Sequence, residues 1–330
     1  MPDQAKEVIR CGICPKACRI PAGFSGECRV RMNLDGRLVA ATYARPCAVH
    51  VDPMEKKPLF HFFPSAAILS LGSAGCNLHC KNCQNADISQ ANPEDVAAHE
   101  LLPADLPALA KRHACRHVAY TYNEPLVNYE YTRDCCITAH KAGIRNVLVT
   151  AGYINAKPLD ALLPHVDAAN VDIKGFSDAF YREVCDGALQ PVLDAVLRML
   201  DAGAHVEITN LVIPTLNDSD EMIDALCAWI SERAGAEVPL HFSRFFPTFR
   251  MTHLPPTPLE TLLRARERAK AAGIRHVYVG NAEVPDGDDT FCAKCGERVV
   301  ERQRYVVASN RLAAGGACPA CGHKAYGVWS

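Results

Sequence analysis

The sequence lacks any long hydrophobic run and any excess of charge of one sign. No stretch of 18 or more apolar residues occurs in the 330-residue chain, so it has no ordinary transmembrane helix. The first ten residues contain no apolar signal segment. A formal net charge of −2 gives the chain none of the basic character of nucleic-acid or anionic-membrane binders. We therefore expect a cytoplasmic protein without a membrane partner, and nucleic acid is not indicated.

Cysteine, in contrast, is abundant, with 17 residues in the chain. Disulfides are rare in the reducing cytoplasm. Eleven of the cysteines fall into three tight groups of four, three and four residues. This grouping favours metal ligation over scattered structural thiols.

The middle group has the spacing Cys76-x3-Cys80-x2-Cys83 and follows an apolar stretch and a glycine-containing turn. We expect these thiols on a loop that leaves a buried strand. A zinc ion would need four ligands, and a 4Fe–4S cluster ordinarily has four thiolates. Three thiolates leave one iron of such a cluster free to bind a substrate. The alternative is a zinc knuckle or a set of redox-active thiols.

The first group, Cys11, Cys14, Cys18 and Cys28, lies in a segment rich in glycine and proline. Such a segment has little hydrophobic core and needs a cross-link, such as a bound metal, to fold. Four thiolates suit either zinc or a second iron–sulfur cluster. Four unligated thiols are the remaining alternative.

The last group consists of two Cys-x2-Cys-Gly turns, with Cys292 and Cys295 in one and Cys318 and Cys321 in the other. The glycines allow the backbone N–H groups to turn toward sulfur. A predicted hairpin at residues 299–307 lies between the turns. This pattern predicts a zinc ribbon.

Apolar, β-branched segments alternate with helical patterns from residue 66 onward. The predicted strands are residues 67–71, 118–122, 147–150, 169–173, 206–213, 240–245 and 277–279. Buried strands alternating with helices favour a parallel sheet. We predict an α/β fold, a partial (β/α)6 barrel at 66–284, preceded by a cysteine-rich metal-binding segment and linker at 1–65. The zinc ribbon would occupy 285–330.

Two local features are also predicted. Residues 52–60 read as an extended linker because they contain two prolines and four charges. Thr257 and Pro258 read as the N-cap and first position of a helix.

Polar residues follow the predicted strands, where barrel enzymes carry their chemistry. Asn123 and Glu124 follow the second strand, Asp172 and Lys174 end the fourth, and His241 lies in the sixth. Any one of them could be a satisfied structural residue. Their recurrence at one rim predicts a functional site.

The three-cysteine spacing resembles the signature of the radical S-adenosylmethionine (SAM) superfamily, with Asn82 where an aromatic residue is usual. The resemblance implies a radical SAM barrel in which Cys76, Cys80 and Cys83 hold a 4Fe–4S cluster and the open iron chelates SAM. Reductive cleavage of SAM would give methionine and a 5′-deoxyadenosyl radical that abstracts hydrogen from a substrate. An electron donor such as flavodoxin or ferredoxin is implied as a partner.

The rim motifs further resemble those of glycyl-radical-enzyme activases of the pyruvate formate-lyase-activating type. By that resemblance, Asn123 and Glu124 would hold the methionine amino group of SAM. Asp172 and Lys174 would meet its carboxylate side, and His241 its ribose. Asn123 stands where that family has glycine.

Segments such as CGICPKACRI, DPMEKKPLFHF, GCNLHCKNCQNADIS and ANVDIKGFSDAFY resemble the radical SAM member of the AmmeMemoRadiSam system. That resemblance implies Memo-like and AMMECR-like protein partners. It names no substrate, which could be a small molecule, RNA or protein, and no residue is assigned to substrate catalysis. The alternatives are a glycyl radical enzyme activase and a non-catalytic iron–sulfur and zinc scaffold or electron carrier.

Overall fold

An eight-stranded sheet organises the chain in this computed structural model, which describes residues 8–329. The strand order is β12-β11-β10-β9-β8-β7-β6-β5, and only the pairing of β5 with β6 is antiparallel. The strands are β5 (Ala48–Pro53), β6 (Ala67–Gly72), β7 (His117–Tyr120), β8 (Arg145–Thr150), β9 (Ala168–Asp172), β10 (His205–Val212), β11 (Leu240–Arg244) and β12 (Val277–Gly280).

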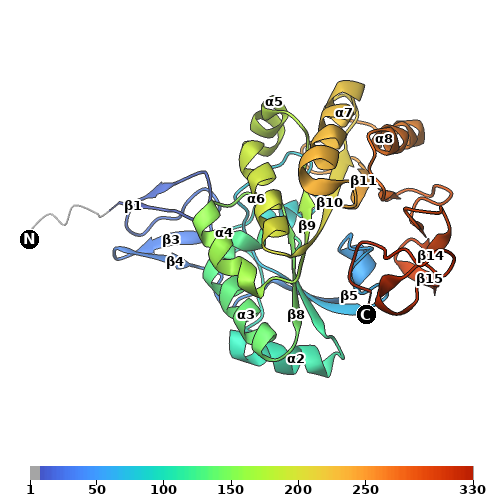
Figure 1. The fold of residues 1–330 in the computed structure, drawn as a ribbon. Coiled ribbons are helices and arrows are strands. Elements are labelled where there is room, and N and C mark those ends of the chain that lie inside the picture. The colour runs from blue at the N-terminus through green and yellow to red at the C-terminus, as the bar shows by residue number, and fades with distance from the viewer. Residues whose placement is uncertain (1–7, 330) are drawn as a thin grey trace, which may run out of the picture.

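Six helical crossovers connect the seven parallel strands, which confirms the predicted partial (β/α)6 barrel. The helices are α1 (Ala86–Ser89), α2 (Leu106–Arg112), α3 (Tyr129–Lys141), α4 (Ala156–Leu162), α5 (Asp178–Phe180), α6 (Gln190–Asp201), α7 (Asp220–Trp229) and α8 (Leu259–Ala271). Of these, α3, α4, α6 and α7 lie on the outer face of the sheet (Figure 1). Shorter 3-10 turns span Met54–Lys56, Pro103–Asp105, Pro125–Asn128, Leu163–His165 and Ala314–Gly316, and π-helical turns span Tyr181–Cys185 and Ile230–Gly235. Within residues 8–329, no helix is long and apolar enough to cross a membrane.

All seven parallel strands were predicted from their apolar runs, because strands of this sheet are buried on both faces. Every residue of β7, for example, is buried. The helix prediction at Thr257 was wrong in detail: α8 starts at Leu259, and no side chain caps it. The Thr257 hydroxyl instead donates to the carbonyl of Val212 and accepts from the amide of Phe245, so it ties the end of β11 to that of β10.

The linker prediction at 52–60 was also incomplete. Residues 48–53 form the antiparallel edge strand β5, and a 3-10 turn follows at Met54–Lys56. Beyond the turn, Leu59 and Phe62 are buried with Ile68, Ala119 and Val147 under the sheet. The predicted domain boundaries, between residues 65 and 66 and between residues 284 and 285, remain predictions. Strands β5 and β6 pair with each other across the first boundary.

Two small units flank the barrel and appear on opposite sides of it (Figure 1). The N-terminal unit contains the two-stranded pairs β1 (Ile9–Arg10) with β2 (Arg19–Ile20) and β3 (Arg31–Leu34) with β4 (Arg37–Ala40). The C-terminal unit is a three-stranded sheet of β13 (Thr290–Phe291), β14 (Arg298–Gln303) and β15 (Val306–Asn310).

The C-terminal unit is held against the segment that follows β5. Arg302 on β14 donates to the carbonyl of Phe60 over 2.6 Å and lies over its ring. Phe62 forms a backbone bridge with Val328. The segment after β5 and the C-terminal unit thus lie together beneath the sheet, at what we call the floor of the barrel.

Candidate active site

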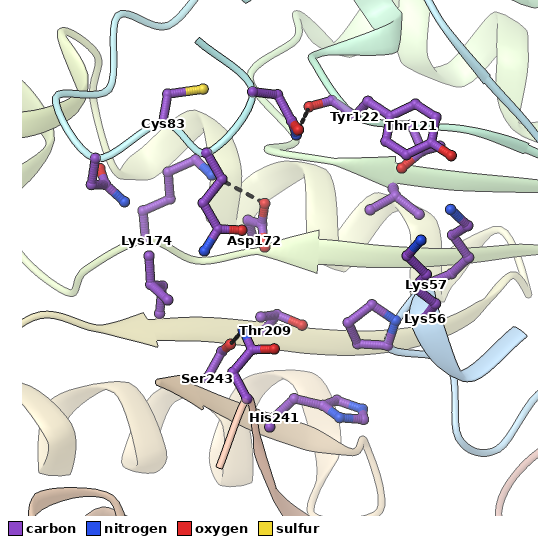
Figure 2. Close-up of a pocket in the computed structure, with 18 of the residues that line it drawn as sticks. Lys56, Lys57, Cys83, Thr121, Tyr122, Asp172, Lys174, Thr209, His241 and Ser243 are labelled. Atoms are coloured by element: carbon purple, nitrogen blue, oxygen red, sulfur yellow. Dashed lines mark hydrogen bonds and ion pairs between the residues drawn. The ribbon is translucent and has the colours of Figure 1, made fainter. Parts of the chain in front are cut away.

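A cavity of about 1110 Å³ opens at the carboxyl ends of the parallel strands. Its walls include all the rim residues predicted from the sequence: Cys76, Cys80, Cys83, Asn123, Glu124, Asp172, Lys174 and His241. Figure 2 shows Cys83 near Asp172 and Lys174 at one end of the cavity, and Lys56 and Lys57 at the other. Ligand sites typically occupy this edge of parallel sheets.

The three cysteines lie on the loop that leaves β6, as predicted. The amide of Leu78 donates to Cys76 Sγ over 3.5 Å, and Cys83 Sγ lies 3.1 Å from Ser89 Oγ. Burial raises the pKa of the Cys76 thiol. A bound cation or cluster would offset this cost of forming the thiolate. The donor set, three thiols on one cavity wall with a backbone N–H aimed at Cys76 Sγ, fits a metal cluster.

Asn123 anchors this loop to the end of β7. Its side-chain amide donates to the carbonyl oxygens of Ser73 and Gly75, over 2.6 and 2.5 Å. The Asn85 amide likewise donates to the carbonyl of Tyr122. A glycine at position 123 could make neither of the first two bonds.

Glu124 is a buried carboxylate at the junction of β7 and β8. It accepts hydrogen bonds from the amides of Leu126 and Ala151 and from the hydroxyl of Thr150, at 2.7 to 3.1 Å. Burial raises its pKa, although these donors oppose the shift. A carboxylate has about four acceptor positions, so one remains for a further donor from the cavity.

Asp172 and Lys174 form an ion pair at the end of β9, with 3.0 Å between Oδ2 and Nζ. Burial would lower the pKa of Lys174, but the carboxylate of Asp172 and the thiol of Cys80 hold it well above its usual value. The side-chain amide of Asn217 donates a hydrogen bond to the carbonyl oxygen of Lys174 over 2.7 Å. The pair therefore presents a fixed positive and a fixed negative group to the cavity beside the cysteine loop.

His241 lines the cavity from β11, and its Nε2 lies 2.7 Å from Glu207. Glu207 is fully buried and also contacts His205 at 3.0 Å and the amides of Phe60 and His61 at 3.1 and 2.7 Å. Burial would raise the pKa of Glu207, but the two histidines hold it well below its usual value. Glu207 thus joins β10 and β11 to the barrel floor and orients the His241 ring.

The C-terminal cysteines have the spacing of a mononuclear metal site. Cys292 Sγ lies 3.6 Å from Cys321 Sγ, and Cys295 Sγ lies 3.7 Å from Cys318 Sγ. A tetrahedral zinc site with Zn–S of about 2.3 Å has sulfur atoms about 3.8 Å apart. The predicted ligand set therefore fits one metal ion.

The N-terminal cysteines surround a small cavity that also contacts Ile20, Arg31 and Asn77. Burial raises the pKa of Cys14 to about 11, while its contact with the Asn77 side chain acts in the opposite direction. Among residues 8–329, the only groups of three or more ligand atoms mutually within 4.8 Å are the C-terminal cysteines and Glu27, His79 and Asp186. The sulfur atoms of the N-terminal group are therefore more widely spaced than those of the C-terminal group.

A pair of lysines in the cavity, Lys56 and Lys57, was not predicted from the sequence. Lys57 is 2% exposed and pairs with Asp52 over 2.7 Å, and Lys56 pairs with the same carboxylate over 2.9 Å. Tyr122 donates to Asp52 and lies beneath the Lys57 ammonium. Asp52 comes from the edge strand that was predicted as a linker. The KK dipeptide was a visible signal, but its burial depended on that unpredicted strand.

The family model of the Radical SAM superfamily matches residues 71–227, which include the cysteine loop and β7 through β10. An uncharacterised protein of Methanocaldococcus jannaschii is 43% identical over 89% of this chain and 87% of its own length. The pyruvate formate-lyase-activating enzyme of Clostridium pasteurianum is 30% identical over 46% of this chain, and the match spans 64% of that enzyme.

Among solved structures, a radical SAM methyltransferase from Sphaerobacter thermophilus has the same fold, with a TM-score of 0.52. The match covers 67% of this chain and 68% of the methyltransferase at 17% identity. At this identity the likeness concerns the fold alone.

Proposed function

Because this chain belongs to the radical SAM superfamily and is an enzyme of that chemistry, we propose that Cys76, Cys80 and Cys83 hold the 4Fe–4S cluster on which the superfamily relies. The cluster would supply one electron to SAM, and the resulting 5′-deoxyadenosyl radical would abstract hydrogen from a substrate. The observation that carries this proposal is the shared cavity, in which the three thiols face the ion pair of Asp172 and Lys174.

The residues around the loop supply complementary groups for SAM. Glu124 keeps one acceptor position for the methionine ammonium, and Asn123 holds the loop beside it. Lys174 offers a positive group to the methionine carboxylate, and Asp172 orients that lysine. His241 has one ring nitrogen committed to Glu207, which leaves the other for a ribose hydroxyl.

The size of the cavity supports a second ligand beside SAM. Small-molecule pockets typically measure about 300–1,000 Å³, and this cavity of about 1110 Å³ is slightly larger than that range. Lys56 and Lys57 line the end opposite the cysteines (Figure 2). We place the substrate there, as a small molecule or as part of an RNA or protein. The motif resemblance favours a role in the AmmeMemoRadiSam system, with Memo-like and AMMECR-like partners, in the cytoplasm.

The test is anaerobic incubation of the reconstituted protein with dithionite and SAM. We expect 5′-deoxyadenosine and methionine in equal amounts from the parent and from Cys227→Ser, which changes a buried thiol of α7. Cys76→Ala should form neither product. If the parent forms no 5′-deoxyadenosine, a metal scaffold or electron carrier becomes the better explanation.

Glycyl radical enzyme activation is the second candidate, supported by the similarity to the Clostridium activating enzyme. In that function, the hydrogen donor would be a backbone glycine of a partner protein. Electron paramagnetic resonance after incubation with SAM, reductant and a glycyl radical enzyme of the same organism would detect a glycyl radical. If 5′-deoxyadenosine forms but no glycyl radical is detected, the activase function is rejected and hydrogen abstraction from another substrate remains the proposed function.

For the flanking units, the proposal assigns zinc to the C-terminal ribbon at 285–330, through Cys292, Cys295, Cys318 and Cys321. Their sulfur spacing supports one tetrahedral ion. The barrel at 66–284 would hold the cluster and SAM, and the segment 1–65 would carry the remaining metal site. A one-electron donor completes the system.

A further inference from the structure

The loop that carries the active-site cysteines is a wall shared by two cysteine sites. Cys76, Leu78 and Cys80 line the large cavity. The residues that alternate with them, Gly75, Asn77 and His79, face the N-terminal unit.

Three contacts define the N-terminal side of this wall. Gly75 packs so closely on the carbonyl oxygen of Cys28 that a Cβ at position 75, where φ is +82°, would overlap it. Asn77 lines the same small cavity as Cys14. Two residues after Asn77, His79 also faces this unit, and its Nε2 lies 3.3 Å from the carbonyl oxygen of Glu27. Both neighbours of Cys76 in the chain thus contact the N-terminal cysteine site directly.

The N-terminal site differs from the C-terminal one in a way that matters for its metal. Its four thiols surround a common cavity but do not come together with the close sulfur contacts of the C-terminal group. A single tetrahedral ion needs those close contacts, whereas a cluster separates its thiolates. The positive Arg31, 3% exposed, lies against the site and its amide donates to Cys28 Sγ over 3.4 Å. The wider spacing of the sulfur atoms favours an iron–sulfur cluster over zinc.

The surface of the N-terminal unit is basic, although the chain as a whole is slightly acidic. Residues 8–45 contain seven lysines and arginines against two aspartates and glutamates, a net charge of +5, whereas the whole chain has −2. Arg10, Arg19, Arg37 and Arg45 are exposed. Phe24 and Leu34 are 58% and 47% exposed on the same unit. Basic surfaces with exposed apolar residues suit brief docking of an acidic protein.

We propose that Cys11, Cys14, Cys18 and Cys28 hold a second iron–sulfur cluster that accepts electrons from an acidic carrier protein and passes them through the shared wall to the active-site cluster. The proposal rests on the proposed function, because the final acceptor is the sulfonium of SAM. Taking flavodoxin as the carrier, its anionic hydroquinone would give up one electron and become the neutral semiquinone. The electron would reduce the N-terminal cluster and then the active-site cluster. It would finally enter the sulfonium of SAM, whose carbon–sulfur bond would break to give methionine and the 5′-deoxyadenosyl radical.

The first experiment tests the second cluster without using activity. The variant C76A/C80A/C83A is reconstituted anaerobically with iron and sulfide, and its metals are counted. We expect about four iron and four sulfide per chain at the N-terminal site, and one zinc at the ribbon. Reduction should give an electron paramagnetic resonance signal that SAM does not change. Further substitution of Cys11 and Cys14 by serine should remove iron, sulfide and signal together.

Two zinc ions and no sulfide in the triple variant would overturn the proposal. That result would leave the proposed function intact, because it concerns only the N-terminal thiols. Conversely, a parent protein that holds the second cluster but never forms 5′-deoxyadenosine would reject the proposed function alone.

The second experiment tests the electron path by comparing two reductants. Dithionite is small and reaches the active-site cluster directly, whereas flavodoxin must dock. In Arg19→Glu/Arg37→Glu, we expect the ratio of flavodoxin-driven to dithionite-driven 5′-deoxyadenosine formation to fall at least tenfold. The matched control, Lys111→Glu/Arg112→Glu on exposed positions of α2, should keep the parental ratio. Cys28→Ser should lower the ratio as the arginine variant does. An unchanged ratio in Cys28→Ser, with its second cluster lost, would reject the relay.

Discussion

The side-chain amide of Asn123 donates a hydrogen bond to the carbonyl oxygen of Gly75 over 2.5 Å, and so ties the end of β7 to the residue before the first active-site cysteine. The same amide also holds the carbonyl of Ser73. An asparagine at this position therefore has a structural role that a glycine could not perform.

Replacement of Asn123 by alanine should loosen the cysteine loop. Two carbonyls would lose their donor, at a cost of about 1–3 kcal/mol. We expect a chelator to remove iron from the reconstituted variant about tenfold faster than from the parent. The exposed Asn92, whose side chain donates to Asp95, provides the control, and Asn92→Ala should behave as the parent does. Equal rates of iron loss in all three proteins would contradict the role assigned to Asn123.

Asp172→Asn should weaken SAM binding, because Lys174 loses the charged partner that orients it. We expect the Kd for SAM to rise about tenfold, which corresponds to about 1.4 kcal/mol. Equilibrium dialysis with cluster-loaded protein measures it. Glu183→Gln, at an exposed carboxylate that is 3.9 Å from Arg182, should leave the Kd unchanged. An Asp172 variant with parental affinity would remove the ion pair from the SAM site.

Glu207→Gln should destabilise the barrel in a pH-dependent way. At pH 7, loss of the buried carboxylate between His205 and His241 should cost about 3–5 kcal/mol. Because the pKa of Glu207 is lowered in the folded protein, its stabilisation is present above the unfolded pKa of about 4.5. It is lost progressively as the pH falls below that value toward the folded pKa.

Urea unfolding followed by circular dichroism at several pH values tests this dependence. The difference in free energy of unfolding between the parent and Glu207→Gln should become smaller below pH 4.5. Glu260→Gln, at an exposed position of α8, should have the parental free energy of unfolding at every pH. A gap that widens as the pH falls would contradict the direction of the pKa shift.

Cys318→Ser should release the metal of the ribbon. We expect zinc to fall by about one ion per chain and limited proteolysis to cleave within residues 285–330, because this unit has a small core built around two of its cysteines. Metal analysis and mass spectrometry of the fragments measure both effects. Cys227→Ser should retain its zinc and its resistance to protease. Full zinc content in the Cys318 variant would show that the ion lies elsewhere.

The parallel strands could be predicted from the sequence because they contain mostly apolar or β-branched residues and are largely buried, as β6 (AILSLG) illustrates. The edge strand β5 could not, because Pro53 and the exposed His50 interrupt the pattern. The burial of Asp52 depends on Tyr122, 70 residues later. Local patterns do not carry information about such distant partners.

Part of the candidate site could be predicted because the carboxyl ends of parallel strands meet at the same edge of a sheet. The three thiols, Glu124 and Lys174 were placed correctly on the cavity wall by that rule. The contacts of the buried Glu207 with the amides of Phe60 and His61, which anchor the segment beyond β5, were not predicted. The partners of Asn123 could not be foreseen either, since they precede it by about 50 residues.

The contact of Arg302 with Phe60 connects the C-terminal cysteine unit to the barrel. Arg302 belongs to the hairpin between the C-terminal cysteine turns, and Phe60 belongs to the segment that Glu207 fixes beneath the cavity. Under the proposed metal assignment, a cell starved of zinc would lose the support for that segment. Zinc depletion should then lower the activity proposed for the barrel even where iron and sulfide are plentiful.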